Sequence, residues 1–246
     1  IRGLAIVLGS DVVNGELFNV QSSKSSFAHR MVSYDKFSFN DAKEYFSKLE
    51  ENGVVLYPED RKNLILDGID TIEKENGIQV EIDTELLDEV VAITEYPTPL
   101  LGTFDEEFLE LPDEVIVNSM KEHQRYFAVY KDGKITNKFI VVSNSYTKDF
   151  SHIIAGNEKV LRPRLSDAMF FWRNDIKNGL SNEGLKKLTF VEGLGSVYDK
   201  SVREASIGVL LADRLACEDK ELLEKTIMLA KADLMSDMVY EFTELQ

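Results

Sequence analysis

Positive charge gathers in one short segment of a chain that is acidic overall. Lys159, Arg162, Arg164 and Arg173 lie within fifteen residues, and Asp167 is the one acid among them. Counting from the acid at position 158, the segment has an excess of two positive charges, whereas the whole chain has a net charge of −16. The planar guanidinium group of arginine pairs well with phosphate oxygens and stays charged at neutral pH. The segment therefore predicts contact with a nucleic-acid backbone, with Lys159, Arg162 and Arg164 as the candidate phosphate ligands.

A second group of cations leads into an aromatic stretch. Lys121 and Arg125 precede Tyr126 and Phe127. Aromatic rings beside an arginine can stack on unpaired bases. Lys121 and Arg125 are therefore a second pair of candidate contacts. Because so acidic a chain repels polyanions at long range, any RNA binding has to depend on local patches such as these two.

Each of these features also has a simpler interpretation. Composition alone favours Arg162 and Arg164 as internal ion-pair partners, since the chain has 44 acidic residues. Tyr126 and Phe127 are favoured as strand core over a stacking platform. The run Met169–Trp172 is favoured as core, with an RNA or subunit contact as the alternative.

Patterns that commonly carry catalysis are missing from the sequence. It has no G-x-x-x-x-G-K-[ST] loop and no G-x-G-x-x-G after a strand. His29, His123 and His152 stand apart, without a His-Asp dyad or metal-ligand spacing. Such histidines are more often surface residues or hydrogen-bonded core residues. Cys217 has no basic residue immediately beside it to make it reactive. We predict no catalytic residue and no metal site.

The composition is that of a globular protein. Of 246 residues, 43% are hydrophobic and 29% are charged, which provides enough apolar material for a core. The single cysteine excludes a disulfide within the chain and fits a reducing cytoplasm. No apolar run approaches the roughly 20 residues of a membrane span. Because the chain begins at Ile1 and stops directly after a helical pattern, we expect a fragment that lacks both ends of a longer protein.

Hydrophobic periodicity and turn residues predict mixed structure in the first part of the chain. The expected elements are a hairpin of Leu4–Gly9 and Val12–Val20 turning near Asn14-Gly15, a helix capped by Asn40 and ended by Gly53, a strand at Val54–Tyr57, and helices from Pro58 to Gly77 and from Thr84 to Glu95.

The middle of the chain adds a strand pair, after which the pattern becomes helical. Here the expected elements are a helix opened by Pro112, strands Tyr126–Tyr130 and Lys138–Ser143 around Asp132-Gly133, two helices at Ile153–Val160 and Ser166–Ile176 interrupted by Pro163, and helices at Val197–Ala216 and Lys220–Tyr240.

This change in pattern predicts an α+β protein with two domains. We expect a mixed domain at 1–180, a linker at 181–194 with glycines at 184 and 193 inside it and at 179 and 195 beside it, and the first helices of an all-helical domain at 195–246.

Several motifs occur in the order found in one protein family. They are Glu95-Tyr96-Pro97, the stretch Met120–Phe127, Ala155–Val160 (AGNEKV), Arg162–Ala168 (RPRLSDA), Phe170-Phe171, Gly193–Ser196 with Asp199-Lys200, and Lys231–Met235 followed by Met238-Val239 and Glu241-Phe242. On these motifs the chain resembles the beta subunit of bacterial two-subunit glycyl-tRNA synthetase. The resemblance covers nearly the whole chain and is weakest before residue 86.

The resemblance implies an enzyme of two alpha and two beta subunits that attaches glycine to its tRNA with ATP. Adenylate formation belongs to the alpha subunit, where ATP and magnesium are expected, so this chain would need no cofactor. The beta subunit engages tRNA for glycine and holds the assembly together. The resemblance also implies that the first domain has the fold of the editing domain of the phenylalanyl synthetase beta subunit, and that the last part begins a helical domain of the HD superfamily.

Two departures limit what the resemblance implies. HD phosphohydrolases use a His-Asp pair on a metal, whereas this chain has Lys231-Ala232-Asp233 at that place. An editing pocket that admits smaller amino acids has nothing to remove when glycine is the substrate. We expect a tRNA-binding and assembly module that is not catalytic alone. The alternatives are an editing deacylase acting on mischarged tRNA and a purely structural module at the subunit interface.

Overall fold

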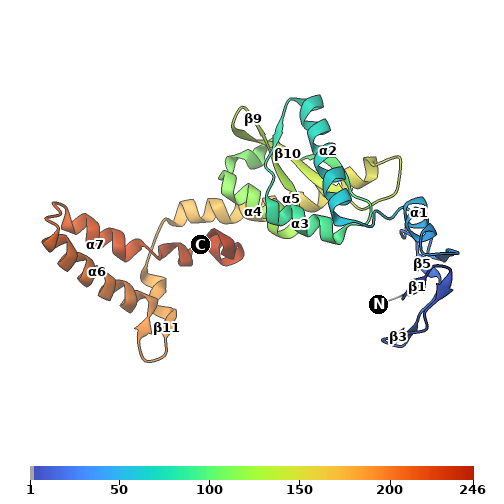
Figure 1. Ribbon diagram of the computed structural model, residues 1–246. Helices are drawn as coiled ribbons and strands as arrows, with labels where there is room; N and C mark the ends of the chain where they lie inside the picture. Colours follow the sequence, from blue (N-terminus) through green and yellow to red (C-terminus); the bar gives the residue numbers. More distant parts are fainter. Residues whose placement is uncertain (1–2) are drawn as a thin grey trace. The chain divides into compact units, whose positions relative to one another are not determined.

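The computed structural model describes residues 3–246 (Figure 1). Ile1 and Arg2, the first residues of the predicted mixed domain, lie outside the described residues. The chain forms two compact units. The first contains the residues up to Leu109 together with Met120–Arg162, and the second contains Glu110–Ser119 together with Pro163–Gln246. The domain limits expected from the sequence, at 180 and 195, stay a prediction.

The first unit begins with three small antiparallel ribbons. They pair β1 (Val7–Leu8) with β2 (Asp11–Val12), β3 (Glu16–Leu17) with β4 (Val20–Gln21), and β5 (Ser25–Phe27) with β6 (Lys36–Ser38). The chain reverses at Gly9, with φ of 60°, and at Phe18-Asn19, with φ of 50° and 59°. The predicted turn at Asn14-Gly15 is wrong. Gly15 instead lies between two ribbons, where its N–H donates to Ser22 Oγ at 2.9 Å.

Helix α1 (Glu44–Glu51) begins later than predicted. Asp41 Oδ1 accepts from the amides of Lys43 and Glu44, whereas Asn40 provides no side-chain cap. The predicted strand Val54–Tyr57 is wrong, because these residues have no regular secondary structure. The carbonyls of residues 55 and 56 accept from the Arg61 guanidinium, both at 2.7 Å, so they bind a side chain in place of a neighbouring strand.

A four-stranded antiparallel sheet forms the centre of the first unit. Its strand order is β7 (Gln79–Val80), β9 (Phe127–Lys131), β10 (Lys134–Ser143) and β8 (Thr98–Thr103). Asp132 and Gly133 join β9 to β10 with φ of 52° and 75°, which confirms the predicted hairpin.

Two helices pack on this sheet. Helices α2 (Pro58–Asn76) and α3 (Thr84–Ile93) confirm the prediction, with Pro58 in the first turn of α2 and Gly77 closing it in the left-handed region. They bury Ile65, Ile69 and Leu87 against Phe127 and Ile140 of the sheet. This core holds the sheet and the two helices together. The charged residues of the candidate sites lie around the ends of these strands and helices.

Helix α5 (Ser151–Asn178) is continuous, so the predicted break at Pro163 is wrong. A proline inside a helix removes one hydrogen bond and costs about 3 kcal/mol. Leu161, Leu165 and Ala168 are each 0% exposed on either side of it. Burial of these side chains offsets the cost of the proline and keeps the helix intact. Helix α4 (Asp113–Gln124) follows Pro112 as predicted.

Short elements and two longer helices complete the second unit. They are η2 (Glu183–Lys187), β11 (Thr189–Val191), β12 (Gly195–Ser196), α6 (Val197–Arg214), α7 (Lys220–Leu229), η3 (Ala232–Met235), α8 (Asp237–Glu241) and η4 (Thr243–Leu245); η1 (Glu106–Glu110) precedes α4. A capping box of Ser196 and Asp199 starts α6 as the periodicity predicted. The predicted helix Lys220–Tyr240 is wrong beyond Leu229, where the chain turns into η3.

The fold is therefore mixed, as predicted. Within residues 3–246, no helix combines the length and the apolar character that crossing a membrane requires.

Candidate nucleic-acid interface

The cations of the basic segment lie on two sides of α5. Successive residues of a helix are rotated by about 100°, so Lys159 and Arg162 point to nearly the same side and Arg164 points about 200° away from Arg162. All three side chains are exposed. The continuous helix thus brings together two of the three predicted phosphate ligands and separates the third, because Pro163 does not turn the chain.

Lys159 and Arg162 line a shallow hollow of about 350 Å³ in the first unit, beside the end of β8. Arg162 Nη2 lies 3.2 Å from Asp105 Oδ2, and both side chains are well exposed. Within the part of the chain that the structure describes, Lys159 has no acidic group within 4 Å of its ammonium. Lys159 is therefore available to an outside anion.

The carboxylate of Glu158, in the same helical turn as Lys159, is hydrogen-bonded to the sheet. Glu158 Oε1 accepts from the amide and from the hydroxyl of Thr103, each at 2.9 Å. Asn157 Oδ1 accepts from the Tyr126 hydroxyl at 2.6 Å, and Asn157 Nδ2 donates to a carbonyl one turn earlier. The motif Ala155–Val160 thus anchors the first half of α5 to β8 and to the residue before β9, and sets the position of Lys159. Sequence reasoning missed this role, since no local pattern pairs Thr103 with a residue 55 positions away.

The second pair of candidate cations is engaged in ion pairs. Lys121 Nζ lies 2.5 Å from Asp83 Oδ2, and Arg125 Nε lies 2.7 Å from Glu89 Oε1. The hydrogen bond from Lys121 lowers the pKa of Asp83, and the same bond raises the pKa of Lys121. Asp83 also caps α3 by accepting from the amide of residue 86. These contacts give Lys121 and Arg125 a structural role, and RNA would have to displace two carboxylates to reach them.

The aromatic pair beside these cations belongs to the core. Tyr126 is 3% exposed and Phe127 is 1% exposed. The Tyr126 ring stacks on Phe139, with centroids 4.6 Å apart. Burial raises the pKa of the Tyr126 hydroxyl to about 12. The strand-core interpretation is confirmed, and stacking of bases on these two rings is excluded by their burial.

The aromatic run on α5 has mixed surroundings. Met169 is buried, Phe171 and Trp172 are half-buried, and Phe170 is 60% exposed. Trp172 lines a cavity of about 520 Å³ within the second unit. Arg173, the last cation of the basic segment, lies 2.7 Å from Glu110, and its hydrogen bond lowers the pKa of that carboxyl. The run is core in part and presents one phenylalanine to solvent.

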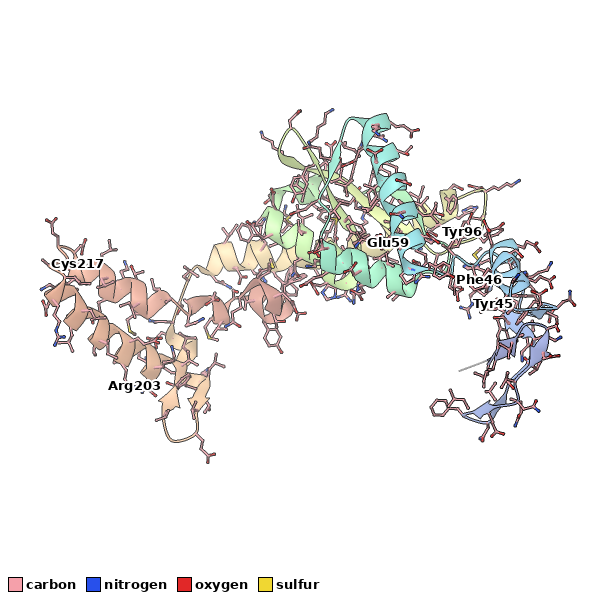
Figure 2. All side chains as sticks on the ribbon, in the orientation of Figure 1. Tyr45, Phe46, Glu59, Tyr96, Arg203 and Cys217 are labelled. Atoms are coloured by element: carbon pink, nitrogen blue, oxygen red, sulfur yellow. The ribbon has the colours of Figure 1, made fainter. Side chains whose placement is uncertain are left out.

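The histidines and the cysteine have ordinary surroundings. His29 is fully buried, and its Nδ1 accepts from the Met31 amide at 3.2 Å, so Nε2 carries the proton and donates to the Asn144 carbonyl at 3.1 Å. This confirms the interpretation of His29 as a satisfied core residue. Cys217 is exposed at the turn between α6 and α7 (Figure 2). Among residues 3–246 there is no group of three or more His, Cys, Asp and Glu side chains placed to hold a metal ion.

Comparison with known proteins identifies relatives along the whole chain. A family model described as "Glycyl-tRNA synthetase beta subunit" matches residues 1–246. Proteins named glycine–tRNA ligase beta subunit are similar: one from Helicobacter pylori (strain Shi470) is 47% identical over 95% of this chain and 36% of its own length. Those from Desulforamulus reducens and Oceanobacillus iheyensis are 44% and 38% identical, each over 100% of this chain and 36% of its own length. The chain spans little more than a third of the length of these relatives.

Proposed function

The chain belongs to the family of glycyl-tRNA synthetase beta subunits, and from that premise we propose that it contacts tRNA for glycine and helps to hold the ligase together. The attachment of glycine with ATP and magnesium takes place at the alpha subunit. This chain contributes binding surface without carrying the chemistry itself. We further propose that the first domain has an editing-domain fold, that residues 195–246 begin an HD-like helical domain, and that the enzyme works in the cytoplasm as a heterotetramer.

The exposed ammonium of Lys159 beside Arg162 is the observation that supports tRNA contact most strongly. The ion pair of Arg162 with Asp105 is exposed on both sides, with 65% and 47% of the side-chain surfaces accessible. Pairs of this kind contribute only about 0–1 kcal/mol. An RNA phosphate can therefore take the place of Asp105 at little cost and accept from Lys159 at the same time.

Arg164, Lys121 and Arg125 have less support in the same role. Arg164 is exposed on the other side of α5, so it would contact a separate phosphate. Lys121 and Arg125 are less accessible than Arg162 and are paired at 2.5 and 2.7 Å. We propose Lys159 and Arg162 as the main contact, Arg164 as an additional one, and the remaining pair as the weakest candidates.

The test uses the complete two-subunit enzyme with Lys159→Glu and Arg162→Glu together. Glycine-dependent ATP–pyrophosphate exchange, which needs no tRNA, should be unchanged. The KM for tRNA in glycylation should rise on the order of 10- to 100-fold, and the salt dependence of tRNA binding should lose a slope of about 2. Arg164→Glu alone should have a smaller effect.

A matched control reverses two exposed lysines on the β9–β10 hairpin, Lys131→Glu and Lys134→Glu, which changes the net charge equally. If both double variants weaken tRNA binding to the same degree, the effect is one of overall charge and the site assignment is wrong. If the first variant leaves glycylation unchanged, the cations do not contact tRNA. Loss of ATP–pyrophosphate exchange together with glycylation would assign Lys159 and Arg162 to the subunit assembly. Steady release of amino acid from mischarged tRNA would support the deacylase alternative.

A further inference from the structure

A groove runs between α1 and α2 of the first unit, on a surface that the proposed tRNA contact does not use. It has a volume of about 670 Å³. Its two walls are single helix faces, because the lining residues recur at helical spacing: 46, 47 and 50 on α1, with Lys43 just before that helix, and 60, 63, 64 and 67 on α2. The segment Val54–Tyr57, which leads into α2, completes the lining. Figure 2 marks Phe46 on α1 and Glu59 at the start of α2, the two helices that border the groove.

Three large apolar side chains that line the groove are accessible. Phe46 is 50% exposed, Tyr57 is 54% exposed and Leu64 is 44% exposed. The rings of Phe46 and Tyr57 are nearly parallel, with centroids 6.3 Å apart and an angle of 12° between their planes. Two neighbouring aromatic rings and a leucine thus give part of the groove an apolar lining, which is the kind of surface that a partner side chain can bury.

The groove also has an acidic lining. Glu50, Asp60 and Asp67 line it and are exposed, and Lys43 is the one cation among its lining residues. For the described part of the chain, none of these three carboxylates has a lysine, arginine or histidine nitrogen within 4 Å. Three unpaired carboxylates repel phosphate groups, so the groove disfavours RNA and favours a cationic partner.

We propose that this groove docks a helix of the alpha subunit that has apolar residues on one side and lysine or arginine beside them. The proposal rests on the assembly role proposed above and assigns a surface to it. A groove bordered by two helices and lined in part by exposed aromatic and aliphatic side chains matches the binding of an amphipathic helix, whose residues at i, i+3, i+4 and i+7 face the groove. The acidic lining selects the helix by charge, since lysine or arginine beside its apolar residues pairs with Asp60 and Asp67.

Site-specific photo-crosslinking in the complete alpha–beta enzyme tests the occupant. A photoreactive phenylalanine derivative replaces Leu64 in full-length beta subunit, and the same residue replaces Glu59, which is exposed on α2 and does not line the groove. Irradiation should join position 64, and not position 59, to an alpha-subunit peptide in which lysine or arginine adjoins apolar residues. Crosslinks to tRNA, to another part of the beta subunit, or to no chain at all overturn the proposal.

Charge reversal gives an independent measurement by titration calorimetry of the two purified subunits. Asp60→Lys with Asp67→Lys should weaken the affinity between alpha and beta on the order of tenfold, and added salt should reduce the difference. The control, Glu59→Lys with Glu75→Lys, makes the same change in net charge on the same helix outside the groove, and should alter the affinity by less than about twofold. Equal weakening by both variants overturns the proposal. If wild-type alpha and beta do not associate, the assembly role itself fails, whereas association without a crosslink at position 64 refutes only the groove.

Discussion

Replacing Gly102 by alanine should destabilise β8, the edge strand of the sheet that positions the helical turn of Lys159 and Arg162. Gly102 of β8 lies directly opposite Phe139 of β10. A Cβ atom added to this glycine would lie 2.9 Å from Cε1 and Cε2 of Phe139, and closer still to Cζ. Carbon atoms pack best at about 3.5–4.0 Å. Either the ring or the strand therefore has to move.

The ring has little freedom to do so. Phe139 is 0% exposed, and its other neighbour is the stacked ring of Tyr126 at 4.6 Å. Strand β8 has to shift, and overpacking of this kind costs about 1–3 kcal/mol. The next residue, Thr103, holds Glu158, so the shift extends to the helical turn that presents Lys159.

Hydrogen exchange followed by mass spectrometry is the suitable assay, because it reports local stability for each strand separately. Gly102→Ala should speed exchange in the β10 peptide 134–143 by about 5- to 150-fold, the equivalent of about 1–3 kcal/mol. Gly156→Ala is the control: this glycine lies inside α5 with nothing within 4 Å of an added Cβ, so alanine should stabilise the helix by about 0.5–1 kcal/mol. Unchanged exchange in β10 for Gly102→Ala would refute the reasoning, and so would equal damage from the control.

Three further variants test single contacts. Tyr126→Phe removes the hydroxyl that donates to Asn157 and should cost about 1 kcal/mol at neutral pH, as measured by urea unfolding. Because the pKa of Tyr126 is raised to about 12 in the folded chain, wild type should lose stability between pH 10 and 12, and Tyr126→Phe should lose less; parallel losses would contradict this. Asp83→Asn removes the ion pair with Lys121, and since the pKa of Asp83 is lowered by folding, the stabilisation is present above pH 3.8 and is lost as pH falls below it. The two proteins should differ by less than about 1 kcal/mol at neutral pH and should converge in acid, and a difference that persists in acid would place the effect elsewhere. Pro163→Ala restores an amide donor inside α5 and should stabilise the chain by about 1–3 kcal/mol in thermal unfolding, whereas a loss of stability would show that the helix depends on the proline.

Elements with a local cause were predictable from the sequence. The hairpin at Asp132-Gly133 depends on two residues that tolerate positive φ, and α2 begins at Pro58 and ends before Gly77 for reasons contained in those residues. The periodicity of α3 and α6 is likewise visible without knowledge of their neighbours.

Elements decided by distant contacts were not predictable in the same way. Pro163 looks like a break because the sequence does not show that Leu161 and Leu165 are fully buried beside it. Val54–Tyr57 has strand-forming residues, yet its carbonyls bind Arg61, a partner that no pattern indicates. Tertiary contacts override local preference in both cases.

The candidate site shows the same division. The charge excess around Lys159 and Arg162 could be found by counting charged residues along the sequence. The chemistry of the guanidinium group was enough to suggest arginine as a phosphate ligand. Their relative directions required a continuous helix, and the pairing of Arg162 with Asp105 joins residues 57 positions apart. The spacing of Asp60, Leu64 and Asp67 could have shown that these residues share one face of α2. The exposure of the groove between α1 and α2 depends on how the two helices pack.

The buried bond between His29 and Asn144 has a consequence for the order in which the chain acquires its structure. It joins residues 115 positions apart, and the side-chain oxygen of Asn144 also accepts from the amides of Glu95 and Tyr96. During synthesis from the N-terminus at roughly 5–20 residues per second, His29 is made about 6–23 s before Asn144. The ribbons that expose Leu8 and Phe18 leave the ribosome during this interval without their attachment to the sheet. During this period the ribbons are open to chaperones and to misassociation, and it lasts at least until β10 and Asn144 have been made.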